Sequence, residues 1–417
     1  MTMATMTTGS DANSPLDTLS PEDRFRALIG LWPALNPEVA PPAGVKAPYA
    51  LALVAGDQGY TVQVTDDGKL SVAVGAPEEP DASVRGQASS LWERLGERGA
   101  GHDLDGDARA LAWLTDLGGE APAQTLADEL ATRGPAIGRE CLGRTFPGKA
   151  EELTVADLVA FAEATSDDNP RFVDISRPGG IIAAPTFPVR FFNPLFFAVF
   201  ADPLVKMDFS RLLFGEMSLT LHGALKPGET VLPEAETLSL EDKDTGQLLR
   251  VGVRLRVGDE LRTEGVANFF VRWKKRTRIQ RLKLPAKPLV LGDERFSASL
   301  PIHEEQPKLF SVAGRDPNPL HLDDAFAKRA GLPGVILQGL CTMAICGRAV
   351  LAELTDNDPS RLKGLKVRFS RPARPGQVLT ISAFAPQEEE GAKRYPFIAT
   401  NDVGDEVITG GEATLTD

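Results

Sequence analysis

The sequence predicts an α+β protein in which two copies of one helix-and-sheet unit follow a smaller α+β domain. The chain has 417 residues, and one hydrophobic core stops growing at roughly 250 to 300 residues. Residues 154–270 and 303–415 share three anchors in the same order, which indicates an internal duplication. Residues 22–120 lie outside this repeat and have a different pattern. We therefore expect two or three domains.

The three anchors fix the register of the repeat. In the first, six identities share one shift of 149 residues: Phe161, Ala164, Asp167, Asn169, Pro170 and Asp174 match Phe310, Ala313, Asp316, Asn318, Pro319 and Asp323. The second aligns Pro227-Gly228 with Pro375-Gly376 at a shift of 148, and the third aligns residues 257–260 with 403–406 at a shift of 146. Because the register barely changes, each copy is predicted to be one complete folding unit.

Within the second copy, the segment GLCTMAICGRAVLAEL (339–354) is apolar nearly all round. Such a helix is buried on most of its faces, so a sheet must wrap it. Strand candidates follow at residues 364–370, 377–385, 394–400 and 405–415, with Gly- and Asp-rich turns that favour antiparallel meanders. One long helix inside a curved antiparallel sheet is the hotdog arrangement.

These patterns predict five regions. They are a flexible tail (1–21), a small α+β domain (22–135), a first hotdog repeat (136–275), a basic linker (276–292) and a second hotdog repeat (293–417).

The composition excludes several classes of function. A net charge of −13 argues against nucleic acid as a partner, because phosphate binding needs a basic face. The three cysteines form no CxxC pair and the four histidines suggest no metal cluster. The most apolar stretch, 191–205, is interrupted by prolines and falls short of the ~20 residues of a membrane span. Without a signal peptide or a C-terminal peroxisomal address, the protein is expected to be cytoplasmic.

The candidate catalytic residues are Asp316 and His321, which lie five positions apart with Pro317 and Pro319 between them. Two prolines disfavour helix, so the segment is predicted to be a stiff loop that directs both side chains into one cavity. A carboxylate and an imidazole can hold one water and transfer its proton at neutral pH. Taken alone, a loop histidine is more often structural.

The segment DPNPLH (316–321), followed by GLCT (339–342), resembles the R-specific enoyl-CoA hydratases of the MaoC-like superfamily, including the hydratase part of the peroxisomal multifunctional enzyme. The resemblance implies that Asp316 and His321 activate a water that adds to trans-2-enoyl-CoA, giving (3R)-3-hydroxyacyl-CoA. Asn318 would orient the loop, and the Gly339 backbone N–H would hold the thioester oxygen. No cofactor is implied, since coenzyme A is part of the substrate. The alternatives are a 3-hydroxyacyl-ACP dehydratase and a non-catalytic acyl-CoA or lipid-binding protein.

Two residues depart from the family pattern. Gln338 stands where the family usually has histidine, so it is expected to help bind substrate or to hydrogen-bond the loop, but it cannot titrate. Gly314-Arg315 replaces the family's Ser-Gly. This puts a cation beside the catalytic carboxylate, where it is expected to bind a substrate phosphate or to lower the pKa of Asp316.

The first copy has Phe172 at the position of His321, so it has no base. We expect this copy to serve as the partner sheet of the second. Its phenylalanine-rich segment 191–200 suggests an acyl tunnel, with Phe172, Phe191 and Phe192 as candidate lining residues, against an alternative of core packing. His222 is predicted to be structural.

The N-terminal region reads as a hairpin over residues 59–74 followed by helices at 88–98 and 108–117. It resembles the sterol carrier protein type 2 domain, which implies a lipid in an apolar tunnel. The alternative is a structural or oligomerisation module. Hotdog units commonly pair, so a homodimer is expected. The basic segment 273–288 is predicted to be a solvated linker, with binding of coenzyme A phosphates as the alternative.

Overall fold

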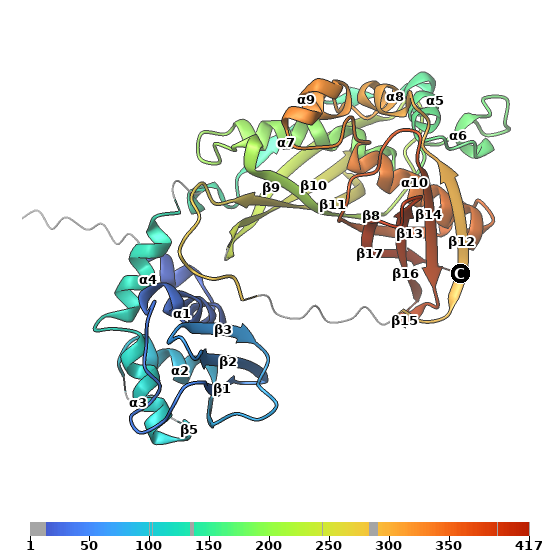
Figure 1. The fold of residues 1–417 in the computed structure, drawn as a ribbon. Helices are drawn as coiled ribbons and strands as arrows, with labels where there is room; N and C mark the ends of the chain where they lie inside the picture. The colour runs from blue at the N-terminus through green and yellow to red at the C-terminus, as the bar shows by residue number, and fades with distance from the viewer. Residues whose placement is uncertain are drawn as a thin grey trace, which may run out of the picture. The chain divides into compact units, whose positions relative to one another are not determined.

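The computed structural model describes residues 14–99, 101, 103–133, 137–243, 245–282, 291–389 and 391–416. These residues divide into two compact units, which are described separately (Figure 1). Unit 1 spans residues 1–136, 241–247 and 272–287, and unit 2 spans residues 137–240, 248–271 and 288–417.

Unit 1 is built on a five-stranded sheet, counted over its described residues, with the strand order β3-β2-β1-β4-β5. The central strands β1 and β4 are parallel, whereas β2 is antiparallel to both β1 and β3. The elements are α1 (Pro21–Leu35), β1 (Tyr49–Ala55), β2 (Gln58–Val64), β3 (Leu70–Val74), β4 (Ala82–Gly86), α2 (Ala88–Leu95), β5 (Asp105–Gly106), α3 (Ala108–Leu117) and α4 (Pro122–Ala131). The predicted hairpin and both predicted helices are confirmed, while α1, β1, β4 and α4 were not predicted.

Parts of two segments, the expected flexible tail and the expected solvated linker, belong to unit 1. Residues 14–21 continue into α1, where the Ser20 side chain accepts a hydrogen bond from the Asp23 N–H, and Leu19 is buried in the core. In the basic segment, the Gln280 N–H donates to the Gly30 carbonyl at 2.8 Å and Leu282 is buried. The apolar side chains within both segments explain why they pack. Residues 1–13 of the expected tail and 283–290 of the expected linker lie outside the described residues.

Unit 2 contains a 12-stranded sheet in the described part of the chain. The main strand order is β12-β14-β16-β17-β13-β8-β11-β10-β9-β6, with β7 paired to β9 and β15 to β16. Its strands are β6 (Thr145–Pro147), β7 (Glu151–Glu152), β8 (Leu212–Leu221), β9 (Thr230–Lys243), β10 (Gly246–Val257), β11 (Glu260–Arg272), β12 (Glu294–Pro301), β13 (Leu362–Phe369), β14 (Val378–Phe384), β15 (Gln387–Glu389), β16 (Ala392–Asn401) and β17 (Glu406–Leu415). The predicted antiparallel meander in the second repeat is confirmed.

The strand order of the sheet is symmetric about the central β8–β13 pair, because the two repeats contribute their strands in mirrored order. In that pair, Lys366 is opposite Ser218, its own counterpart at the repeat shift of 148. The equivalent rings of Phe161 and Phe310 also contact each other, with centroids 5.8 Å apart. An approximate two-fold axis therefore relates the two repeats.

The helices of unit 2 are α5 (Val155–Ala164), α6 (Pro170–Val173), α7 (Phe192–Ala201), α8 (Gln306–Ala313), α9 (Asp324–Arg329) and α10 (Gly339–Thr355). Most of α10 is buried, as predicted for the central helix of a hotdog unit, and it packs on β12, β13 and β14. Figure 1 shows α5, α7, α8 and α9 along one side of the curved sheet. Both repeats share one continuous hydrophobic core.

Within the described residues, no helix combines the length and the apolar character that crossing a bilayer requires.

Candidate active site

Asp316 and His321 lie together on the loop that links α8 to α9, as the sequence predicts. The Nε2 atom of His321 is 3.7 Å from Oδ2 of Asp316, and both side chains keep a small exposed fraction, 10% and 15%. Asn318 shapes the loop by two contacts: its Oδ1 accepts from the Leu320 N–H at 3.1 Å, and its own N–H donates to Asp316 Oδ1 at 3.4 Å. The pair is therefore held in place and remains accessible.

The hydrogen bond of the second ring nitrogen of His321 determines which of the two ring nitrogens carries the proton. Nδ1 lies 2.9 Å from the carbonyl oxygen of Ile336. A carbonyl only accepts hydrogen bonds, so Nδ1 must be protonated, and in the neutral ring Nε2 keeps its lone pair. The basic nitrogen therefore faces Asp316.

Burial raises the pKa of the Asp316 carboxyl above its ordinary value. The positive charge of His321 and the hydrogen bond from the Asn318 N–H act in the opposite direction and lower it. Desolvation disfavours the ionised form of a carboxyl group and makes it a stronger base once it is ionised. Asp316 is thus better suited to take a proton from water than an exposed aspartate.

Gly339 is the first residue of α10, and its N–H has no partner within the helix. A Cβ atom at this position would lie 3.1 Å from a ring carbon of Phe369, so the ring packs directly on the bare backbone. The free N–H groups of a helix start attract a developing negative charge. Gly339 lies three residues after Ile336, the hydrogen-bond partner of His321.

Gln338 does not bond the catalytic loop as expected. Its Nε2 donates to the Pro307 carbonyl at 2.9 Å, at the start of α8, and the side chain is fully buried. Its Oε1 is also buried and has no hydrogen-bond partner among the described residues. Because no part of this side chain is exposed, it supports α8 instead of binding substrate.

The prediction that Arg315 lowers the pKa of Asp316 is wrong. Arg315 pairs with Glu151 at 2.5 Å and its guanidinium lies 5.7 Å from the centre of the Phe191 ring. The groups that shift the pKa of Asp316 do not include Arg315. Glu151 lies in the two-residue strand β7, far away in sequence, and no sequence signal pointed to it.

The three candidate tunnel residues are all buried, and they lie in different surroundings. Phe191 contacts Arg315 and so lies near the catalytic loop. Phe172 is fully buried in α6, and Phe192 packs on Phe196. A continuous series of ring contacts also runs from Gly339 through Phe369, Phe214, Phe269 and Phe196. These rings make an apolar path beside the candidate oxyanion site.

The first repeat also lacks the backbone N–H that corresponds to Gly339, a difference that the register of the repeat did not reveal. In both repeats the loop before the helix makes the same two backbone bonds: Ile182 and Ala183 donate to Arg171 and Leu225, whereas Ile336 and Leu337 donate to Leu320 and Ala373. This equivalence puts Pro185 at the position of Gly339. Proline has no N–H, so the first repeat lacks the oxyanion donor as well as the histidine.

Comparisons with known proteins agree with this fold. The family model described as MaoC like domain matches residues 290–406, and the model described as FAS1-like, dehydratase domain region matches residues 140–267. Among solved structures, a MaoC-like dehydratase from Phytophthora capsici aligns at a TM-score of 0.58, with 24% identity, over 66% of this chain and 96% of that one. Full-length peroxisomal multifunctional enzyme type 2 from Drosophila melanogaster aligns at a TM-score of 0.53, with 22% identity, over 82% and 63%.

Three curated relatives are similar in sequence. Peroxisomal multifunctional enzyme type 2 of Drosophila melanogaster is 28% identical over 72% of this chain and 51% of its own length. The mouse protein of the same name is 34% identical over 51% and 29%. Probable enoyl-CoA hydratase 2 of Dictyostelium discoideum is 30% identical over 47% and 69%. The chain thus spans about half of the fly enzyme and under a third of the mouse enzyme.

The fold and site define a double-hotdog protein in which the second repeat carries the Asp316–His321 pair, whereas the first keeps the aspartate and has Phe172 in place of the histidine. The chain belongs to the MaoC-like family, which includes the enoyl-CoA hydratase 2 proteins.

Proposed function

We propose that this protein is a hydro-lyase that reversibly hydrates trans-2-enoyl-CoA to (3R)-3-hydroxyacyl-CoA. The observation that carries the proposal is the 3.7 Å separation of His321 Nε2 and Asp316 Oδ2 on the loop next to the start of α10. The names of the relatives, which include enoyl-CoA hydratase 2 and 3-hydroxyacyl-thioester dehydratase, support it.

The spacing of the pair suits one shared water. An oxygen atom about 2.8 Å from both His321 Nε2 and Asp316 Oδ2 fits above a 3.7 Å gap at ordinary hydrogen-bond lengths. As the water oxygen bonds to C3 of the substrate, one of its protons passes to the catalytic pair. A proton from the pair then reaches C2, so one water is added and no net proton is taken up.

The electrons of the double bond move onto the thioester oxygen while the water adds. The N–H of Gly339 is proposed to donate to that oxygen and stabilise the enolate. Neither step calls for a metal or a redox cofactor. In the described residues, no cluster of three His, Cys, Asp or Glu side chains could hold a metal ion.

The test uses a matched set of variants and the hydration of crotonyl-CoA. We expect Asp316→Asn and His321→Gln each to lose at least about a hundredfold in kcat, which is a common contribution of general acid–base groups. Asp167→Asn and His222→Gln make the same chemical changes in the first repeat and should keep kcat within about twofold. Near-normal activity of both second-repeat variants would refute the assignment.

A second candidate is dehydration of 3-hydroxyacyl groups carried on acyl carrier protein. The match of residues 140–267 to a dehydratase region favours it. The chemistry at Asp316 and His321 is the same and only the thioester carrier differs. Side-by-side kinetics with coenzyme A and carrier-protein substrates decide between them, since the true carrier should give the higher kcat/KM.

We also propose that unit 1 binds a lipid, as its resemblance to sterol carrier protein type 2 implies. Its core of apolar side chains between sheet and helices supports the idea. Binding of a fluorescent fatty acid, measured before and after its displacement by unlabelled lipid, tests it. A protein that never takes up the probe would favour a structural or oligomerisation role.

The remaining proposals concern assembly and location. Hotdog units commonly pair, so we propose a homodimer, which sedimentation analysis can check. We propose a cytoplasmic location because its three free cysteines, all buried, suit a reducing compartment. Several relatives are named peroxisomal, so cell fractionation should compare both compartments.

A further inference from the structure

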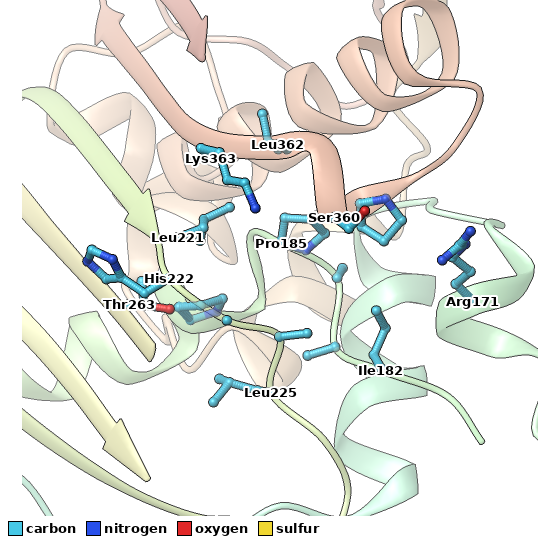
Figure 2. A pocket seen from close by; sticks show the side chains of 16 residues that line it. Arg171, Ile182, Pro185, Leu221, His222, Leu225, Thr263, Ser360, Leu362 and Lys363 are labelled. Carbon is cyan, nitrogen blue, oxygen red and sulfur yellow. The ribbon is translucent and has the colours of Figure 1, made fainter. Parts of the chain in front are cut away.

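A cavity of about 200 Å³ lies where the first repeat meets residues 359–363 of the second repeat (Figure 2). Its wall includes Ile182 and Ala183, which make the same backbone hydrogen bonds as Ile336 and Leu337 of the second repeat. It also includes Leu225, the counterpart of Ala373, and Pro185, the counterpart of Gly339. The cavity therefore lies beside the segment of the first repeat that corresponds to the segment leading into α10 in the second repeat.

This cavity cannot perform the proposed hydration. Phe172 replaces the catalytic histidine and is fully buried. Pro185, which lines the cavity, offers no N–H to a thioester oxygen. The space is nevertheless open, and most of its lining is apolar, with Ala183, Ala184 and Leu225 buried at its base. A site of this kind suits an apolar chain.

The polar groups of the cavity indicate the sign of the ligand's charge. Arg171 pairs with Asp358 at 3.5 Å and His222 with Glu264 at 3.0 Å, so both already have carboxylate partners. Lys363 is exposed and forms no ion pair within the described residues. Figure 2 shows its amino group directed from β13 toward Leu221 and Pro185. An unpaired ammonium group at an apolar cavity attracts an anionic head group.

We propose that the cavity binds the free carboxylate of a medium-chain fatty acid, with Lys363 pairing the head group. Apolar cavities near 150 Å³ hold a benzene molecule, so about 200 Å³ has room for a chain of about eight carbons. A carboxylate fits better than a thioester, because Pro185 removes the N–H that a thioester oxygen needs and Lys363 supplies a full positive charge.

The test measures binding of octanoate to the full-length protein by titration calorimetry. We expect the native protein to bind one equivalent of octanoate. The Lys363→Met variant, which keeps the length of the side chain and removes its charge, should bind it at least about tenfold more weakly. Ala224→Trp, at an exposed position of the lining, should block the same equivalent. The control Lys226→Met removes an exposed lysine of the adjacent turn that does not line the cavity, and it should bind as the native protein does.

Comparison ligands separate the sources of binding. Octan-1-ol should bind at least about tenfold more weakly than octanoate, because it lacks the charge. Crotonyl-CoA hydration by Lys363→Met should stay within about twofold of the native rate, since the cavity is separate from Asp316 and His321. The proposal is overturned if octanoate binds Lys363→Met and Ala224→Trp as it binds the native protein, or if only octanoyl-CoA responds to these substitutions.

Discussion

Asp316 and Asp167 occupy equivalent positions in the two repeats, and each follows a residue with a left-handed backbone. Arg315 has φ 55° and Ser166 has φ 54°. Each aspartate also accepts a hydrogen bond from the N–H of the asparagine two residues later. The two loops therefore share a backbone shape that brings a carboxylate into the protein interior. Only the second repeat adds a histidine to this loop, whereas the first repeat has Phe172 there, so the buried carboxylate of Asp167 has no imidazole beside it.

Asp167→Asn should stabilise the protein at alkaline pH. Burial raises the pKa of Asp167 from 3.8 to about 6. The stability that the protonated Asp167 carboxyl gives to the folded state is fully present below the pKa of this group in the unfolded chain. That stability is lost as the pH rises through about 6, the pKa in the folded state. We expect Asp167→Asn to gain roughly 1 to 3 kcal/mol in unfolding free energy at pH 8 and nothing at pH 4.

Denaturation followed by far-ultraviolet circular dichroism is the suitable measurement of that gain. All four tryptophans, Trp32, Trp92, Trp113 and Trp273, belong to unit 1 and do not report on Asp167. Equal stabilisation at both pH values would show that ionisation of Asp167 is not the cause. An exposed control, Asp174→Asn, should show no gain, because its pKa is lowered by hydrogen bonds from Ser176.

Asp316→Asn should become more stable as it loses activity. Burial also raises the pKa of Asp316, so the ionised carboxyl is destabilising at neutral pH. Removing the charge should raise the unfolding free energy at pH 8 and leave it nearly unchanged below pH 4. Parallel measurements of kcat and of unfolding would detect the opposite signs. A variant that loses both stability and activity would instead indicate collapse of the loop.

The internal repeat made the fold of the second part of the chain predictable from the sequence. Features that depend on contacts between distant residues could not be predicted. Identities such as Phe161 with Phe310 and Asp167 with Asp316 fix the register from sequence alone, and the contact between the two rings confirms it. Pro185 was missed because the loop before the helix is shorter in the first repeat, which shifts it out of that register. Glu151 was missed because a two-residue strand has no periodicity.

Hydrophobic spacing was also a poor guide to the segments that pack on unit 1. Helix α1 contains Pro33, which argues against a helix in a sequence reading. The basic segment 273–282 has many charges and few apolar side chains, yet Ile279 and Leu282 pack on the core of unit 1. Its partners, including Gly30 and Glu129, lie far away in the sequence. Only the folded chain brings them together.

Glu151→Gln should lower kcat by loosening the catalytic loop. Glu151 anchors Arg315, the left-handed residue directly before Asp316, and also contacts the buried Arg190 at 3.2 Å. A non-glycine residue in this conformation costs about 1 kcal/mol, so it needs an anchor. We expect kcat to fall about threefold to tenfold with a smaller change in KM, because Glu151 does not contact substrate.

Arg315→Gly is the companion to that variant. Glycine adopts the left-handed conformation without strain, so the double variant Glu151→Gln with Arg315→Gly should lose no more activity than Arg315→Gly alone. Steady-state kinetics on the four proteins of this cycle measure the coupling. Fully additive losses would mean that Glu151 acts independently of Arg315.

Gly339→Ala should impair turnover more than it impairs folding. The added methyl group would lie 3.1 Å from the Phe369 ring, so either the ring or the start of α10 must shift. A displaced N–H would stabilise the enolate oxygen less well, and losing one such donor typically costs about a hundredfold or more in kcat.

Gly347→Ala is a matched control in the same helix, because its Cβ would meet the side chains of Leu365 and Thr186 at 3.2 Å. That variant should keep kcat, since residue 347 lies within the helix where its N–H is already bonded. Crotonyl-CoA kinetics and thermal unfolding of both variants separate the two effects. Equal losses of kcat in the two variants would mean that crowding of α10, and not a donor at Gly339, limits the reaction.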